Sequence, residues 1–198
     1  SKIDWTHGKY SKSNTIRITT SGMQQITSLA VIGDTDKESY LAVSSINYPV
    51  IYIYNKEHQN ISRLVSHTMG ITCIKSLGYN LFSGSIDLIA RMWDVYNGEP
   101  IFWCNTRCEK IYSIEPAFYC GKMILFTGGK DNAIQCFSIT DKKPLFEIKL
   151  NKNLVPKKIS FITGNNQTFG DHAKLMIISE CLSQNNPKNY QVHYFEFI

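Results

Sequence analysis

The stretch HTMGITCIKSLGYNLFSGSIDLIARMWD, residues 67–94, is the part of the sequence most informative about its fold. It holds three short apolar runs that are rich in β-branched and aromatic residues, the types that favour strands. A His precedes the first run, an Asp in a tight turn follows the second, and Trp-Asp ends the third. Asn97-Gly98 comes soon afterwards and is a strong signal for a two-residue hairpin turn, so a fourth strand is expected. The stretch therefore predicts one sheet of four antiparallel strands.

The same arrangement recurs along the chain at a period of about 40 residues, which is typical of propellers with four strands in each blade. The aromatic residue that ends the third run recurs as Tyr54, Trp93, Phe137 and Phe195. Alignment of the chain on these residues predicts four units, at about 24–67, 68–107, 108–150 and 155–198. We therefore expect an all-β chain that forms a single domain or a portion of one.

The predicted strands of the first three units are 26–32, 40–45, 50–54 and 61–66; 71–77, 80–85, 89–95 and 101–106; and 110–115, 123–128, 133–139 and 145–150. The fourth unit is looser, with strands predicted at 158–162, 175–181 and 191–197 and long polar loops between them. The alternating segment 15–20 has no neighbouring strands to join. It is predicted to complete the fourth unit, where it would cover an edge that otherwise favours aggregation.

With its His, Ser-Gly-Ser, Asp and Trp-Asp in this order, the second unit resembles a WD40 repeat, and residues 24–197 resemble the WD40 family of β-propellers. The resemblance implies a propeller of four-stranded antiparallel blades. It also implies a chain of hydrogen bonds through His67, Ser83, Asp87 and Trp93. The chemistry fits, because a carboxylate accepts from one imidazole nitrogen while a hydroxyl can link the other nitrogen to an indole N–H.

The third unit keeps only part of this pattern. Thr127 and Asp131 stand where the second unit has Ser and Asp, but Phe137 replaces the Trp. No His precedes its first strand, where Glu109-Lys110 stand instead. The complete network is therefore expected in the second blade alone, and the other blades are expected to depend more on packing.

The number of blades stays open at this point. WD40 rings usually have seven blades, which would need roughly 280 residues at about 40 per repeat, whereas this chain has 198 residues. Four blades can close a ring by themselves. Alternatively, the chain is a portion of a larger propeller, which Trp5 favours if it ends a strand of a preceding blade, or it pairs with another chain.

The composition points to a folded protein of a reducing compartment. The chain is 43% hydrophobic and 19% charged, which is typical of folded domains. No apolar run approaches the ~18 residues of a membrane-spanning helix, and the first residues have no signal-peptide pattern. The six Cys form no Cys-x-x-Cys pair. We therefore expect an intracellular protein, in the cytoplasm or nucleus, without membrane association.

No group of residues predicts catalysis or metal binding. The Ser, His and Asp of the second unit are the residue types of a nucleophilic triad, but no Gly-x-Ser-x-Gly is present and the repeat accounts for all three. Cys104 and Cys108, with Cys120 nearby, are a weak zinc candidate because no second pair with ligand spacing follows. We therefore expect neither enzyme activity nor a metal or other cofactor.

In propellers of this family, partners usually bind the face made by the loops that enter each first strand and by the turns between the second and third strands. The resemblance places the following residues there: Thr68, Met69, Ile86, Lys110, Tyr112, Lys130, Lys157 and Lys158. The leading hypothesis is a rigid scaffold that binds a protein or peptide partner, within a multiprotein complex. The four Lys and the net charge of +5 leave RNA or another acidic partner as the alternative.

Overall fold

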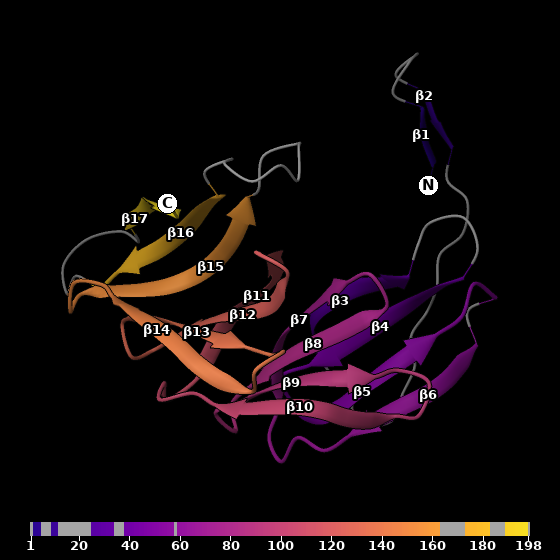
Figure 1. The fold of residues 1–198 in the computed structure, drawn as a ribbon. Coiled ribbons are helices and arrows are strands. Elements are labelled where there is room, and N and C mark those ends of the chain that lie inside the picture. Colours follow the sequence, from indigo (N-terminus) through magenta and orange to yellow (C-terminus); the bar gives the residue numbers. More distant parts are fainter. Residues whose placement is uncertain are drawn as a thin grey trace.

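The structure is a computed structural model that describes residues 2–4, 9–11, 25–33, 38–57, 59–162, 173–182 and 189–197. Every regular element in these ranges is a β-strand, so the chain is all-β as predicted. Four antiparallel sheets follow one another along the chain and lie in one curved row (Figure 1). No helix long and apolar enough to cross a bilayer occurs in the described part of the chain.

The first three sheets have four strands each, paired in chain order. The first sheet contains β3 (Ile26–Gly33), β4 (Ser39–Ser45), β5 (Tyr48–Tyr54) and β6 (Asn60–Val65). The second contains β7 (Ile71–Leu77), β8 (Asn80–Ser85), β9 (Ile89–Asp94) and β10 (Glu99–Asn105). The third contains β11 (Ile111–Tyr119), β12 (Lys122–Gly129), β13 (Ala133–Ser138) and β14 (Lys143–Lys149). Short hairpin turns join neighbours, as in antiparallel meanders.

The fourth sheet has three described strands, β15 (Leu154–Ile162), β16 (Ala173–Cys181) and β17 (Asn189–Phe197). Near the N-terminus, β1 (Lys2–Asp4) and β2 (Lys9–Ser11) form a separate two-stranded sheet. The segment 15–20, predicted to complete the fourth sheet, and Trp5 both lie outside the described residues. The completion of the fourth sheet and the number of blades in an intact ring therefore remain predictions.

Proline accounts for the main differences between predicted and observed strands. The predicted strands 50–54, 101–106 and 145–150 start directly after Pro49, Pro100 and Pro144. The observed strands begin earlier and include these prolines. Pro100 and Pro144 lie on β10 and β14, the outermost strands of their sheets, where a missing N–H costs no ladder bond.

Two first strands are also longer than predicted. β11 continues through Pro116 to Tyr119, and β15 begins at Leu154 and runs through Pro156. Both strands lie at a sheet edge, and in β15 a β-bulge follows the proline directly. Edges and bulges are the positions where sheets accept proline.

Apolar side chains fill the space between each pair of consecutive sheets. Ile51 and Leu64 of the first sheet pack with Leu81 and Trp93 of the second in one buried cluster. Similar clusters lie between the second and third sheets and between the third and fourth. Because the third sheet is covered on both faces, its inner strand β13 is buried at every position, including the polar residues Gln135 and Ser138.

A β-bulge occurs near the beginning of the first strand in each of the four consecutive sheets. The residues skipped by the register are Thr27, Thr72, Tyr112 and Lys157. These first strands are neighbours, with β3 packed against β7, β7 against β11 and β11 against β15. The bulges therefore repeat at the same end of consecutive sheets, beside the loops that enter the first strands.

Candidate functional site

A chain of hydrogen bonds crosses the second sheet from Asp87 to Trp93. His67 Nδ1 lies 2.8 Å from Asp87 Oδ2, and His67 Nε2 lies 2.7 Å from Ser83 Oγ. The indole N–H of Trp93 donates to the same hydroxyl at 2.8 Å. Because Ser83 accepts from the indole and donates to Nε2, the pattern fits a neutral imidazole with its proton on Nδ1.

Burial and hydrogen bonding together set the charge states of this network. Burial lowers the pKa of His67, an effect that outweighs the hydrogen bond with Asp87. Burial alone would raise the pKa of Asp87, but its bonds with His67 and with the backbone N–H groups of Thr68 and Ile89 lower it overall. The network therefore holds a neutral imidazole against a charged carboxylate.

The same carboxylate ties two segments of backbone together. Asp87 Oδ2 accepts from the N–H of Thr68 at 3.0 Å, and Oδ1 accepts from the N–H of Ile89 at 3.1 Å. Thr68 belongs to the loop that enters β7, and Ile89 begins β9. The network therefore fixes the loop that carries Thr68 and Met69 against the turn between β8 and β9.

In the third sheet, the corresponding polar groups lack this bridge. Among the described atoms, Thr127 Oγ1 and Asp131 Oδ1 are buried without a hydrogen-bond partner. Burial raises the pKa of Asp131, although backbone N–H groups counteract it. The third sheet thus buries two polar groups that the second sheet would join through an imidazole, an arrangement that costs stability.

The pairing of strands shows which residue replaces the histidine. Ile71 begins β7 as Ile111 begins β11, and each lies opposite the end of the second strand. Counted back from the paired isoleucines, Arg107 corresponds to His67, but its side chain is exposed whereas that of His67 is buried. Glu109-Lys110, assigned to that place from the sequence, instead correspond to Met69-Gly70, because the loop must be counted back from the paired isoleucine.

The third and fourth sheets bring three of the expected face residues together. The Lys157 ammonium lies 3.9 Å from the centroid of the Tyr112 ring, and the Lys110 ammonium lies 5.6 Å from it. Both distances are within the range of cation–π attraction. Tyr112 and Lys157 are the bulged residues of β11 and β15. The cluster therefore spans two sheets at the end where their entering loops lie.

Carboxylates balance much of the positive charge on this face. Lys157 forms an ion pair with Glu180 at 2.9 Å, and Lys130 forms one with Glu109. The hydrogen bond with Glu109 is the main reason why the pKa of Lys130 is raised. Lys158 lies apart from the Tyr112 cluster, exposed and opposite Ile178 on β16. The expected rim of four lysines is thus a mixed-charge surface around one aromatic ring.

The second sheet contributes an apolar part of the same face. Met69 is 49% exposed, Thr68 is exposed and Ile86 is partly exposed. Ile86 N–H donates to the carbonyl of Gly70 at 3.0 Å, which joins the turn to the entering loop. A Cβ at Gly70 would lie 1.5 Å from the carbonyl oxygen of Ile46, so the first sheet's turn packs directly against this loop.

The cysteines of the weak zinc candidate, Cys104 and Cys108, belong to the apolar cluster between the second and third sheets. Cys104 and Cys108 are buried, and burial raises the pKa of Cys104 to about 12 and that of Cys108 to about 11. No group of three or more His, Cys, Asp or Glu residues suited to a metal ion occurs in the described ranges.

Comparisons with known proteins agree with the fold. No family model matches the chain. Over 104 residues, 51% of the chain, it is 26% identical to the nuclear distribution protein nudF of Aspergillus niger, of which the match covers 23%. The crystal structure of the computationally designed Ika4 protein matches with a TM-score of 0.63 at 16% identity, over 92% of this chain and 99% of that one. Together with the four consecutive antiparallel sheets, these likenesses are compatible with a WD40-like propeller.

Sequence reasoning missed the residues that moderate the charge of the face. Glu109 lies in the loop before β11, one turn away from its partner Lys130, and Glu180 lies on β16, far along the chain from its partner Lys157. The pairing of β15 with β16 brings Lys157 and Glu180 together. The sequence predicts a strand at 175–181, but it does not predict how β16 pairs with β15, because the bulge after Pro156 shifts the register of the two strands.

Proposed function

We propose that this chain is a non-catalytic scaffold that binds another protein through the loop face of its sheets. The loop face is made of Thr68, Met69 and Ile86 of the second sheet, Lys110, Tyr112 and Lys130 of the third, and Lys157 of the fourth. The observation that carries the proposal is the Tyr112 ring, flanked by lysines from two sheets. Aromatic and basic anchors of this kind are typical of protein-binding surfaces.

The rigidity of the surrounding structure supports this role. The His67 network holds the entering loop of the second sheet, and the bulges place equivalent residues of consecutive sheets at one end. Loops presented by such a framework lose little conformational freedom on binding. The exposed Met69 provides an adaptable apolar contact next to the basic and aromatic cluster.

The geometry favours a protein partner over RNA. Glu109 and Glu180 pair with two of the lysines, which weakens the attraction of the face for phosphates. Single-stranded nucleic acid binds largely by stacking bases on aromatic rings, whereas the Tyr112 ring already lies beneath two ammonium groups. RNA remains the alternative that the experiment below distinguishes.

The six cysteines are all free, which fits the proposed location in the cytoplasm or nucleus. No catalytic step enters the proposal, because the Ser83, His67 and Asp87 side chains are committed to one another and to Trp93. The buried hydroxyl of Ser83 is not presented to a substrate.

Photo-crosslinking tests the proposal directly. A benzoylphenylalanine residue replaces Met69, and the protein is irradiated in a cell extract with and without ribonuclease. A matched control places the same residue at Tyr79, which is similarly exposed (46%, against 49% for Met69) and lies in the turn between β7 and β8, at the other end of the sheet.

The proposal predicts a discrete protein adduct from position 69 that survives ribonuclease and is lost when Tyr112→Ser is also present. Equal adducts from both positions would show that the loop face is not the binding surface. An adduct that ribonuclease removes would instead support the nucleic-acid alternative.

A further inference from the structure

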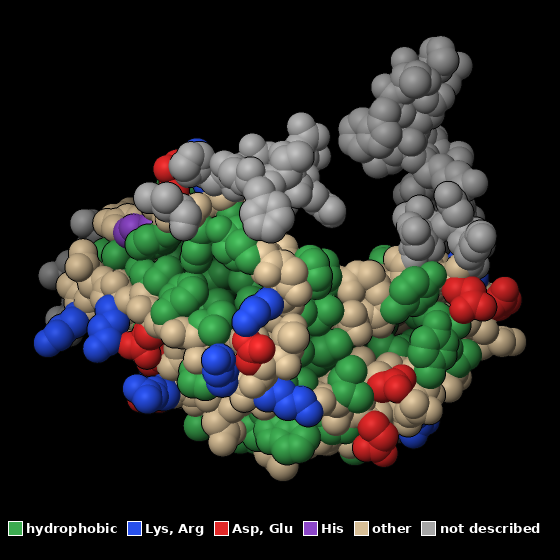
Figure 2. Space-filling model, in the orientation of Figure 1, with side chains coloured by type: hydrophobic (Ala, Val, Ile, Leu, Met, Phe, Trp, Pro, Cys, Tyr) green, Lys and Arg blue, Asp and Glu red, His purple; other side chains and the backbone are tan. Residues whose placement is uncertain are grey.

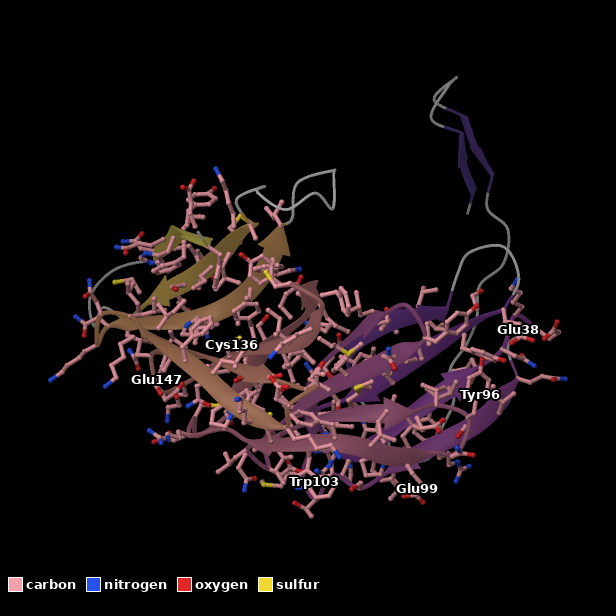
Figure 3. All side chains as sticks on the ribbon, viewed as in Figure 1. Glu38, Tyr96, Glu99, Trp103, Cys136 and Glu147 are labelled. Carbon is pink, nitrogen blue, oxygen red and sulfur yellow. The ribbon has the colours of Figure 1, made fainter. Side chains whose placement is uncertain are left out.

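A groove runs along β14, on the outer side of the third sheet, and reaches the loop before β11 at Arg107 and the turn between β12 and β13 at Asp131. Its larger part, of about 530 Å³, lies between β14 and β10, the outermost strand of the second sheet. It adjoins a hollow of about 380 Å³, and both are lined by Arg107 and Glu147. Figure 3 labels Trp103 on β10, Cys136 on β13 and Glu147 on β14, which mark the strands that border the groove.

The two strands that border the groove each have one unpaired edge among the described strands. In the second sheet, β10 pairs only with β9, and in the third, β14 pairs only with β13. The backbone N–H and C=O groups along such an edge are available to an added strand. Peptides in an extended conformation bind in this way, with backbone bonds that give affinity and side chains that alternate in direction.

The lining of the groove combines apolar and basic groups. The buried rings of Phe102 and Phe137 line it, and Leu145 on β14 is 42% exposed. Its basic residues and those of the adjoining hollow are Arg107, Lys142, Lys143, Lys149 and Lys152, whereas its acidic residues are Asp131 and Glu147. Lys and Arg side chains also stand out around the third sheet, in the lower left of Figure 2.

We propose that this groove binds an acidic peptide in an extended conformation, which adds to the free edge of β14. The unpaired backbone selects a polypeptide over a nucleic acid, because a strand edge has no matching pattern of donors and acceptors in a nucleic-acid backbone. The excess of basic side chains selects acidic residues in the peptide. The site adjoins the loop face at Asp131 but shares no residue with it, and it does not depend on the role proposed for that face.

The test measures binding of a fluorescein-labelled peptide with alternating Glu and Val residues by fluorescence anisotropy. A second peptide carries N-methyl groups on alternate residues, which removes the N–H donors that pair with a strand edge. A third has Lys in place of Glu. Hydrogen exchange of the β14 backbone amides, with and without the first peptide, locates the bound strand.

The proposal predicts that only the first peptide binds and that it slows exchange in β14. The double variant Lys143→Glu and Lys152→Glu, which changes two exposed side chains at opposite ends of the groove, should weaken binding about tenfold or more. Lys158→Glu, an equal change of charge on the fourth sheet, should leave it unchanged. Equal binding of the N-methylated peptide, unchanged β14 exchange, or displacement of the peptide by oligouridine RNA would overturn the proposal.

Discussion

His67 Nδ1 lies 2.8 Å from Asp87 Oδ2, and both side chains are almost completely buried. Removal of one partner leaves the other polar group buried without its bond, which costs more than the bond itself contributes. Asp87→Ala should therefore lower the free energy of unfolding by ~2–4 kcal/mol, and Trp93→Ala should do the same through a cavity. Urea denaturation measures both. A loss below about 0.5 kcal/mol would contradict the role assigned to the network.

Acidification should destabilise the protein through the same pair. The pKa of His67 is lowered below its usual 6.5 in the folded state, so below about pH 6.5 the unfolded chain takes up a proton that the folded protein resists. Asp87, whose pKa is also lowered, adds a second loss as the pH falls below its usual 3.8. Stability should thus be fully present above these values and should decline as the pH falls.

The measurement compares urea denaturation at about pH 7.5 and about pH 5. Wild-type protein should lose stability between these conditions, and His67→Gln, which starts less stable, should lose less. Equal losses in the two proteins would show that other groups are responsible.

The contrast between the second and third sheets gives a matched pair of variants. Ser83→Ala removes the hydroxyl shared by His67 and Trp93 and should cost about 1–3 kcal/mol. Thr127→Val removes a buried hydroxyl that has no partner among the described atoms, so it should be neutral or stabilising. Thermal or chemical denaturation of both variants checks this. A loss of more than 1 kcal/mol from Thr127→Val would indicate that its hydroxyl is satisfied.

The fourth sheet provides a prediction for the segment 15–20. The outer edge of β17 has no strand paired to it within the described ranges, and Tyr190, Val192 and Tyr194 on this strand are exposed. If the segment pairs there, Ile16→Pro with Ile18→Pro should remove two N–H donors and expose the edge, with aggregation on heating. The control, Ile16→Val with Ile18→Val, should keep the wild-type behaviour in light scattering. Equal scattering from the two variants would place the segment elsewhere.

Much of the fold could be predicted because its sheets are local. Each sheet forms from consecutive strands joined by short turns, so the repeat period of the sequence predicts the order of the strands. Two strands of the second sheet, Ile71–Leu77 and Asn80–Ser85, have the predicted bounds. Errors arose at prolines. The strands predicted at 110–115 and 158–162 leave out Pro116 and Pro156, but both prolines lie in edge strands, and which strands lie at an edge depends on sheet order.

The net charge of the loop face could not be predicted from the sequence alone. The lysines are visible in the sequence, but their net effect depends on Glu109 and Glu180, which approach them only through turn geometry and strand register. The replacement of His67 by Arg107 in the third sheet likewise requires the pairing of Ile111 with Gly129. Short sequence motifs report local structure well, whereas surface electrostatics depends on contacts between segments.

The central claim, that the loop face binds a protein, is tested most directly by recovery of partners from a cell extract across a salt series. The proteins compared are wild type, Met69→Asp and Tyr79→Asp, two exposed positions at opposite ends of the second sheet. We expect a discrete partner that is retained at high salt by wild type and by Tyr79→Asp and is lost from Met69→Asp. Retention by all three proteins, or recovery of RNA alone with a steep dependence on salt, would contradict it.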